Sequence, residues 1–109
     1  MNKYKNEKVT INGIRFDSKA EARRYQELWL LEKAGAIKEL VLQPSFVLQP
    51  NYKKNGKTIR AITYKADFAY YENNKYIVED VKGFITKEFR LKEKMFNYIY
   101  KDIELRIVR

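Results

Sequence analysis

Two predicted β-strands that carry charged side chains constrain this chain more than any other feature. The first contains Asp67, the second contains Asp80 and Lys82, and the chain turns between them at Asn73-Asn74. Because side chains alternate faces along a strand, Asp80 and Lys82 point the same way and the neighbouring strand can bring Asp67 beside them. Glu79 points to the opposite face and is expected to be either structural or paired in solvent. Carboxylates suit a hard divalent cation, and an adjacent ammonium group suits a phosphate, so the pattern predicts a metal site that faces a phosphate.

The N-terminal half of the sequence predicts a hairpin, a helix and extended chain. Residues 9–16 alternate apolar and polar side chains around Asn12-Gly13, which is the strongest short-range signal for a tight hairpin. Residues 18–34 have helical spacing of apolar side chains between a capping-box sequence and a glycine stop. Residues 37–49 are mostly extended but are interrupted at Gln43-Pro44, where the missing amide indicates a bulge or an edge position.

The C-terminal half predicts the centre of a sheet and a second helix. A second hairpin signal, Asn55-Gly56, precedes two predicted strands over residues 58–71 and 75–81. A helix over residues 86–100, with its N-cap at Thr86, and a final strand over residues 104–108 follow. Phe89, Phe96 and Ile99 are expected to face the core from the helix. The whole chain, 1–109, is therefore predicted to be a single α/β (α+β) domain with a central mixed β-sheet flanked by two helices.

Composition narrows the classes of function. The chain has 23 Lys and Arg against 14 Asp and Glu, a net charge of +9, which favours a polyanionic partner and nucleic acid first. It has no Cys and no His, so any catalysis must use carboxylates, lysines, hydroxyls and a metal. No apolar run approaches the length of a membrane span and no signal peptide is evident, so we expect a soluble, cytoplasmic protein without a membrane partner. A domain of this size buries roughly two thirds of its unfolded surface, which leaves a homodimer open.

The order of helices, strands and acidic residues resembles the PD-(D/E)XK nuclease superfamily. The resemblance covers most of the chain and extends to small phage-type members related to Holliday junction resolvases and transposon end-cleaving endonucleases. It implies a restriction-endonuclease-like core in which Asp67 and Asp80 bind the metal and Lys82 is the motif lysine. It also implies that Glu21 in the first helix completes the catalytic metal site and that Gln43 lies near the scissile phosphate of the nucleic acid.

Two assignments leave alternatives open, and one residue departs from the motif. Asp80 and Lys82 could form a cross-strand ion pair on a solvated face, although their apolar neighbours predict a buried strand in which an unpartnered carboxylate is costly. Glu21 lies three residues after Ser18 and could instead close a capping box by accepting the Ser18 amide. Ala66 stands where the motif name has proline, a residue that shapes the strand and carries no chemistry.

Basic side chains gather in two other places. Lys87, Arg90 and Lys94 are spaced as one stripe on the second predicted helix, where we interpret them as nucleic-acid-binding residues that clamp the phosphate backbone. The alternative is a solvated helix face. Residues 1–8 form a basic N-terminal segment with Lys3, Lys5 and Lys8, for which two alternatives are open: it clamps the phosphate backbone in the same way, or it is simply flexible.

These patterns and the resemblance lead to two hypotheses. The first is a Mg²⁺- or Mn²⁺-dependent endonuclease, a hydrolase that cleaves phosphodiester bonds in double-stranded or branched DNA such as a Holliday junction or a flap. The resemblance implies a phage-encoded protein that acts in DNA recombination in the cytoplasm of a bacterial host cell. The second is a non-catalytic nucleic-acid-binding module with a nuclease-like fold, whose acidic residues serve structure alone. A divalent cation should raise the melting temperature of an endonuclease but not that of a binding module, because ligands that bind the folded state stabilise it.

Overall fold

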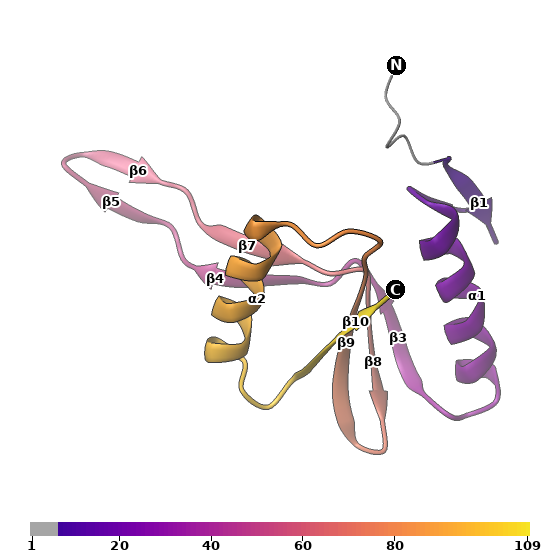
Figure 1. Ribbon diagram of the computed structural model, residues 1–109. Coiled ribbons are helices and arrows are strands. Elements are labelled where there is room, and N and C mark those ends of the chain that lie inside the picture. Colours follow the sequence, from indigo (N-terminus) through magenta and orange to yellow (C-terminus); the bar gives the residue numbers. More distant parts are fainter. Residues whose placement is uncertain (1–6) are drawn as a thin grey trace.

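The computed structural model describes residues 7–109 as an α+β protein with two helices and several small sheets (Figure 1). The elements follow one another as β1 (Val9–Ile11), β2 (Ile14–Phe16), α1 (Lys19–Lys33), β3 (Lys38–Leu42), β4 (Ser45–Gln49), β5 (Tyr52–Lys54), β6 (Lys57–Ile59), β7 (Ile62–Lys65), β8 (Phe68–Glu72), β9 (Lys75–Val81), α2 (Lys87–Ile99) and β10 (Glu104–Val108).

The N-terminal hairpin and the first helix confirm the sequence predictions. β1 pairs antiparallel with β2 across Asn12 and Gly13, whose φ angles of 52° and 78° are both left-handed, as a two-residue type I′ turn requires. α1 begins after Ser18, whose side chain accepts the Glu21 amide at 3.1 Å. It ends before Gly35, at a φ of 82° that favours glycine.

The main sheet has four strands in the order β10-β9-β8-β3. β9 pairs in parallel with β10, whereas β8 pairs antiparallel with both β9 and β3, so the sheet is mixed as predicted. β9 occupies its predicted residues and turns from β8 at Asn73 and Asn74, which have φ angles of 51° and 66°.

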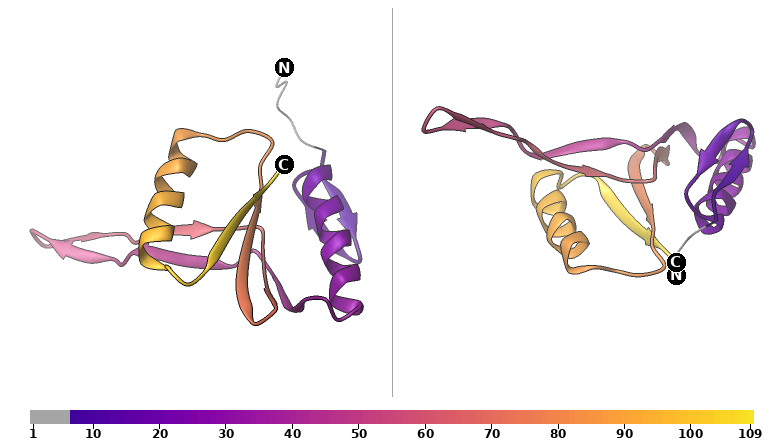
Figure 2. Two further views of the ribbon diagram at one scale, coloured as in Figure 1. Left: turned by 60° about the horizontal axis from the view of Figure 1, so that its bottom comes forward. Right: turned by 90° about the horizontal axis from the view of Figure 1, so that it is seen from above.

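The two helices cover opposite faces of this sheet (Figures 1 and 2). One core joins Ala22, Tyr25 and Leu28 of α1 to the face of the sheet that carries Phe68 and Ile77. The other core joins α2 to the face that carries Ala69 and Val78, through buried Phe89 and Phe96. α2 therefore occupies its predicted place, although Ile99 is 43% exposed and the prediction that it faces the core is wrong.

The predicted strand over residues 58–71 is wrong as a single element, because the structure divides it into β6, β7 and β8. Only β8 belongs to the central sheet, while β7 pairs with β4 and β6 pairs with β5. The partner changes at Ala66, whose amide donates to the Pro44 carbonyl at 3.0 Å, and at Asp67, whose amide donates to the Glu79 carbonyl at 3.0 Å. A strand that exchanges partners between two sheets cannot remain one straight element.

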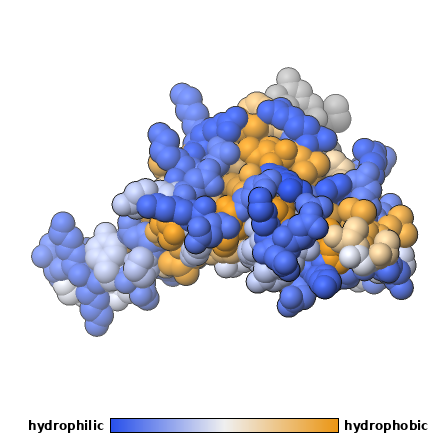
Figure 3. Space-filling model, turned by 90° about the horizontal axis from the view of Figure 1, so that it is seen from below, coloured by the Kyte–Doolittle hydropathy of each residue, from blue (hydrophilic) through white to orange (hydrophobic). Residues whose placement is uncertain are grey.

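β5 and β6 prolong the β4-β7 pair into a ribbon that projects beyond α2 (Figures 1 and 2). Hydrophilic residues dominate the surface at this projecting end (Figure 3). The radius of gyration of 16.0 Å is larger than the ~13 Å typical of a compact domain of about 100 residues. The projection accounts for part of that difference because it places its residues far from the core.

Two expectations concern the chain outside the sheets. In the basic N-terminal segment predicted over residues 1–8, Lys3 and Lys5 lie outside the described residues, whereas Lys8 is described and exposed. Between residues 7 and 109, neither helix has the length and apolar character needed to cross a membrane.

Candidate metal and nucleic-acid site

Asp67 and Asp80 come together where the chain crosses from the β4-β7 pair into the central sheet. Asp67 lies between β7 and β8, and Asp80 lies near the end of β9. The register pairs Phe68 with Glu79, so the residues that flank this pair, Asp67 and Asp80, are neighbours on adjacent strands. The Val81 amide donates to Asp67 Oδ2 at 2.7 Å and holds the carboxylate in place. The predicted proximity of the two carboxylates is confirmed.

The surroundings of Asp67 favour its protonated form in the absence of a cation. Burial and the neighbouring Asp80 carboxylate raise the pKa of Asp67 to about 7, against the lowering effect of the Val81 hydrogen bond. Two carboxylates held this close repel each other when both are charged. A divalent cation would relieve that repulsion, so the pair has the electrostatic character of a cation site.

Asp80 is only 3% exposed and has two partners on the α2 side of the sheet. The Tyr64 hydroxyl donates to Asp80 Oδ2, and Lys82 Nζ lies 3.6 Å from Oδ1. Burial and the Asp80 contact raise the pKa of Tyr64 well above its ordinary value, so its hydroxyl remains a donor. Lys82 Nζ also lies 4.7 Å from the centre of the Phe89 ring. Asp80, in β9, and Lys82, which directly follows β9, thus lie on the same side, as the strand periodicity predicted.

Glu21, Gln43 and Asp67 line one hollow of about 180 Å³ between α1 and the sheet. Gln43 is placed there by its own backbone, because its amide donates to the Asp67 carbonyl at 2.9 Å and its φ is 52°. Burial raises the pKa of Glu21, and the charges of Asp17 and Asp80 raise it further. Of the four residues predicted to surround the metal and the phosphate, Glu21, Gln43 and Asp67 therefore line one hollow, and Asp80 lies beside Asp67 without lining it.

At the start of α1, Glu21 takes part in only half of the capping box that was the alternative to a metal role. The Ser18 side chain accepts the Glu21 amide, which is half of a capping box. Among the residues that the structure describes, no hydrogen bond returns from the Ser18 amide to the Glu21 carboxylate. Glu21 also lines the hollow that Asp67 lines.

The set of oxygen donors is small, and it suits magnesium. Within residues 7–109, no three acidic side chains converge closely enough to form a ready-made metal cage. Mg²⁺ ordinarily keeps several waters and is held by one or two carboxylates, which Asp67 and Asp80 supply, with Glu21 across the hollow. The chemistry of these oxygens fits Mg²⁺ or Mn²⁺ and lacks the nitrogen and sulfur ligands that zinc prefers.

The predicted basic stripe lines a hollow of its own. Lys87, Arg90 and Lys94 surround a depression of about 530 Å³ together with Arg109. Arg90 is also paired with Glu93 at 2.8 Å. No candidate metal ligand lines this depression. A third hollow, of about 290 Å³, includes Lys82 and shares Thr86 with the basic one, so the stripe continues from the Lys82 side of the site.

A buried ion pair lies behind the site and joins α1 to β9. Glu79 has no exposed surface, and its two carboxylate oxygens accept Arg24 Nε at 2.8 Å and an Arg24 terminal nitrogen at 2.7 Å. The Tyr70 hydroxyl also donates to this carboxylate. Because Arg24 follows Glu21 on α1 and Glu79 precedes Asp80 on β9, the pair fixes the helix and the strand that carry the candidate residues.

A comparison with protein families assigns the whole chain. A family model described as "Protein of unknown function (DUF1064)" matches residues 1–109. The chain belongs to the DUF1064 family. No curated protein matches it.

Three residues of this DUF1064 chain escaped sequence reasoning. Tyr64 lies in a predicted strand, and nothing in its local pattern indicates a bond to Asp80, 16 residues away. Arg24 meets Glu79 across 55 residues, a pairing that only the tertiary fold reveals. Arg109 reaches the basic hollow of the DUF1064 chain because β10 runs parallel to β9.

Proposed function

We propose that the protein is a divalent-metal-dependent DNA endonuclease of the PD-(D/E)XK type, with a restriction-endonuclease-like core, that hydrolyses phosphodiester bonds. The observation that carries the proposal is the pair of adjacent carboxylates, Asp67 and Asp80, with Lys82 Nζ 3.6 Å from Asp80 on the same strand face. Two neighbouring acidic groups with a lysine beside one of them are the kind of groups that metal-assisted phosphoryl chemistry uses.

The carboxylates of Asp67 and Asp80 would hold Mg²⁺ or Mn²⁺, with Glu21 completing the set. When bound, such a cation would supply positive charge to a phosphate oxygen and lower the pKa of a water molecule. The Val81 amide keeps Asp67 oriented, and the Tyr64 hydroxyl does the same for Asp80. This preorganisation keeps the two carboxylates from turning away from each other when both are charged.

Lys82 would act on the reacting phosphate rather than on the metal. Its side chain is 30% exposed and reaches a hollow of about 290 Å³, so its ammonium group is accessible to a phosphate. The Asp80 carboxylate and the Phe89 ring both lie close to Nζ and help to position the ammonium group. There it would orient the attacking water or stabilise the charge that develops in the transition state.

The basic surface would hold the DNA. The net charge of +9 favours a polyanion, and Lys87, Arg90, Lys94 and Arg109 share a depression that adjoins the Lys82 hollow. Gln43 lines the separate hollow of Glu21 and Asp67, where it would contact a phosphate next to the one that Lys82 meets. Double-stranded or branched DNA, such as a Holliday junction or a flap, is the substrate class that we propose, in the phage and recombination setting that the resemblance implies.

One observation favours the second candidate, a nucleic-acid-binding module without activity. Asp67 and Asp80 already have protein partners, since Val81, Tyr64 and Lys82 satisfy them. Carboxylates that are satisfied in this way can persist as purely structural groups. In that case a divalent cation would not stabilise the fold.

Thermal unfolding and cleavage assays in parallel test the proposal. Mg²⁺ or Mn²⁺ should raise the melting temperature of the wild type but not of Asp67→Asn or Asp80→Asn, and both variants should lose cleavage of linear, nicked, flap or four-way DNA. Lys82→Met should keep the thermal shift and lose the rate. Asp102→Asn removes an exposed carboxylate elsewhere and serves as the matched control. A wild type that shows neither a thermal shift nor cleavage would support the binding module instead.

A further inference from the structure

Residues 50–61 form a two-stranded ribbon that stands apart from both cores. We call this segment, which contains β5 and β6, the arm. Every residue from Asn51 to Arg60 is exposed, and neither β5 nor β6 contributes to either hydrophobic core. Figures 1 and 2 show the arm reaching past α2 into open space. An isolated hairpin is at best marginally stable in water, so the arm has no packing reason to extend this far.

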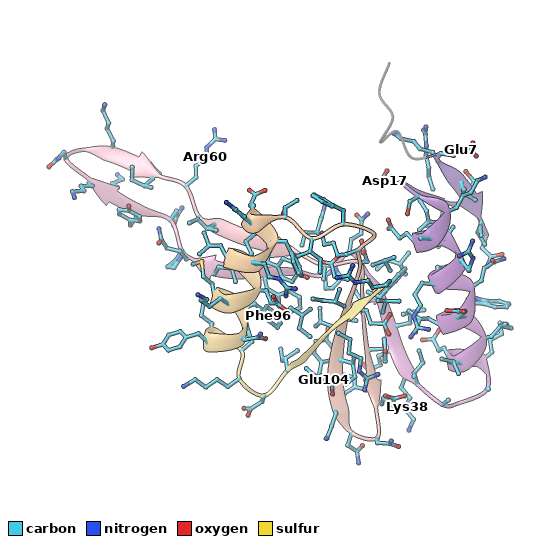
Figure 4. All side chains as sticks on the ribbon, viewed as in Figure 1. Glu7, Asp17, Lys38, Arg60, Phe96 and Glu104 are labelled. Atoms are coloured by element: carbon cyan, nitrogen blue, oxygen red, sulfur yellow. The ribbon has the colours of Figure 1, made fainter. Side chains whose placement is uncertain are left out.

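The arm is uniformly basic. It carries Lys53, Lys54, Lys57 and Arg60, and the chain has no Asp or Glu between Val41 and Ala66. Arg60 points away from the ribbon (Figure 4). Among residues 7–109, no acidic side chain pairs with any of these four cations. The arm therefore presents positive charge that the protein itself leaves uncompensated.

The register of the arm sets two like charges directly against each other. Lys54 pairs with Lys57 beside the Asn55-Gly56 turn, and like charges directly opposite each other destabilise an antiparallel pair. A bound phosphate would turn this repulsion into an attraction. The arrangement is unfavourable for a free hairpin and favourable for one that contacts a polyanion.

The face that carries these two lysines also carries an apolar pair. Tyr52 pairs with Ile59, and Lys54 pairs with Lys57. Lys54 and Lys57 each lie two positions along the strand from a member of the first pair, so all four side chains share one face. Tyr52 is 46% exposed and Ile59 is 38% exposed. A ribbon of two strands about 4.8 Å apart fits the major groove of a DNA duplex, which is about 12 Å wide. Lysines beside an apolar pair would then meet phosphates beside base edges.

We propose that the arm grips double-stranded DNA by lying in a groove, with its four cations on the flanking phosphates and Tyr52 and Ile59 toward the bases. This inference rests on the proposed function in that DNA is the partner. The chain leads from the arm through β7 to Lys65, which lines the same hollow as Lys82. A duplex held by the arm therefore extends toward the candidate site along the β4-β7 pair.

Binding without cleavage tests the arm. The variant in which Lys53, Lys54, Lys57 and Arg60 are all replaced by Gln should bind a fluorescent duplex more weakly in EDTA. The slope of log K against log salt should fall by up to about 3.6 units, because each neutralised phosphate contributes about 0.9. The control variant replaces four exposed lysines outside the arm and loses the same charge: Lys33, Lys38, Lys75 and Lys101.

The outcomes separate the arm from the nuclease. Equal losses in the arm variant and the control variant would overturn the proposal, and the lysines would then only prevent strands of other chains from pairing with the arm. A wild type that fails to bind duplex would also overturn it. So would a sedimentation result in which the wild type is a dimer and the arm variant is a monomer, while both bind duplex equally well. Weak binding by the arm variant together with a wild type that never cleaves would support the arm and reject the endonuclease. Because every arm residue is exposed, the melting temperature of the arm variant should match that of the wild type.

Discussion

Replacing Arg24 tests the buried ion pair that joins α1 to β9. The Glu79 carboxylate has no exposed surface, and Arg24 donates to it at 2.8 and 2.7 Å. In Arg24→Met the carboxylate keeps the Tyr70 hydroxyl but loses its positive partner, and breaking a buried pair in this way costs about 3–5 kcal/mol. In a domain near 100 residues each kcal/mol lowers the melting temperature by about 4 °C or more, so we expect a fall of at least about 12 °C.

Urea denaturation followed by circular dichroism measures the loss. The double variant Arg24→Met, Glu79→Gln removes both charges and should lose less stability than the sum of the two single changes, by about 0.5–3 kcal/mol. Arg23→Ala, at an exposed neighbouring position, is the control and should change the free energy of unfolding by no more than about 0.5 kcal/mol. If Arg24→Met resembles Arg23→Ala, or if the two single losses simply add, the pair does not hold the helix to the strand.

Three further predictions concern the site. Glu21→Gln should melt like the wild type without metal but gain less stability from Mg²⁺, and an unchanged gain would remove Glu21 from the metal ligands. Replacing Lys87, Arg90 and Lys94 together by Gln should weaken binding to all duplex sequences alike and lower the salt slope by up to about 3 units, whereas an unchanged slope would make them a solvated face. The pKa of Asp67 is raised to about 7, so between about pH 4 and pH 7 the folded chain holds a proton that the unfolded chain has lost. Without metal, the free energy of unfolding should therefore fall as pH rises through that window, and Asp67→Asn should flatten the fall; identical pH profiles in urea would contradict this.

Local signals explain which parts of the fold could be predicted. Asn12-Gly13 and Asn55-Gly56 form turns because asparagine and glycine accept the left-handed φ angles that a two-residue hairpin needs. Ser18 and Thr86 cap the two helices through their own side chains, so the helix starts were predictable from neighbouring residues alone. The division of residues 58–71 was not, because it depends on strand partners that lie far away in the sequence.

The same distinction applies to the candidate site. Asp80 and Lys82 share a face because of strand periodicity, and the turn before β9 brings Asp67 to the neighbouring strand, so sequence was sufficient for these three. Tyr64 and Arg24 contact acidic residues of β9 only once β7 and α1 have packed against the sheet. Such contacts depend on packing between elements, and a periodic pattern within one element carries no information about them.

The consecutive acidic residues Glu79 and Asp80 of β9 also help to fix the register in which the strands pair. A slip of one residue would turn Glu79 toward Tyr64 and Asp80 toward Arg24, because successive side chains face opposite cores. The side chain of Asp80 is one methylene shorter than that of Glu79, so it could not reach the guanidinium of Arg24 equally well. The apolar residues that precede Asp80 on β9 would also move to the opposite faces of the sheet. A misaligned sheet would therefore bury two poorly matched charges at once. The alignment that closes the core is also the one that assembles the candidate site, so a misaligned molecule would be disfavoured by the same buried charges that mark the site.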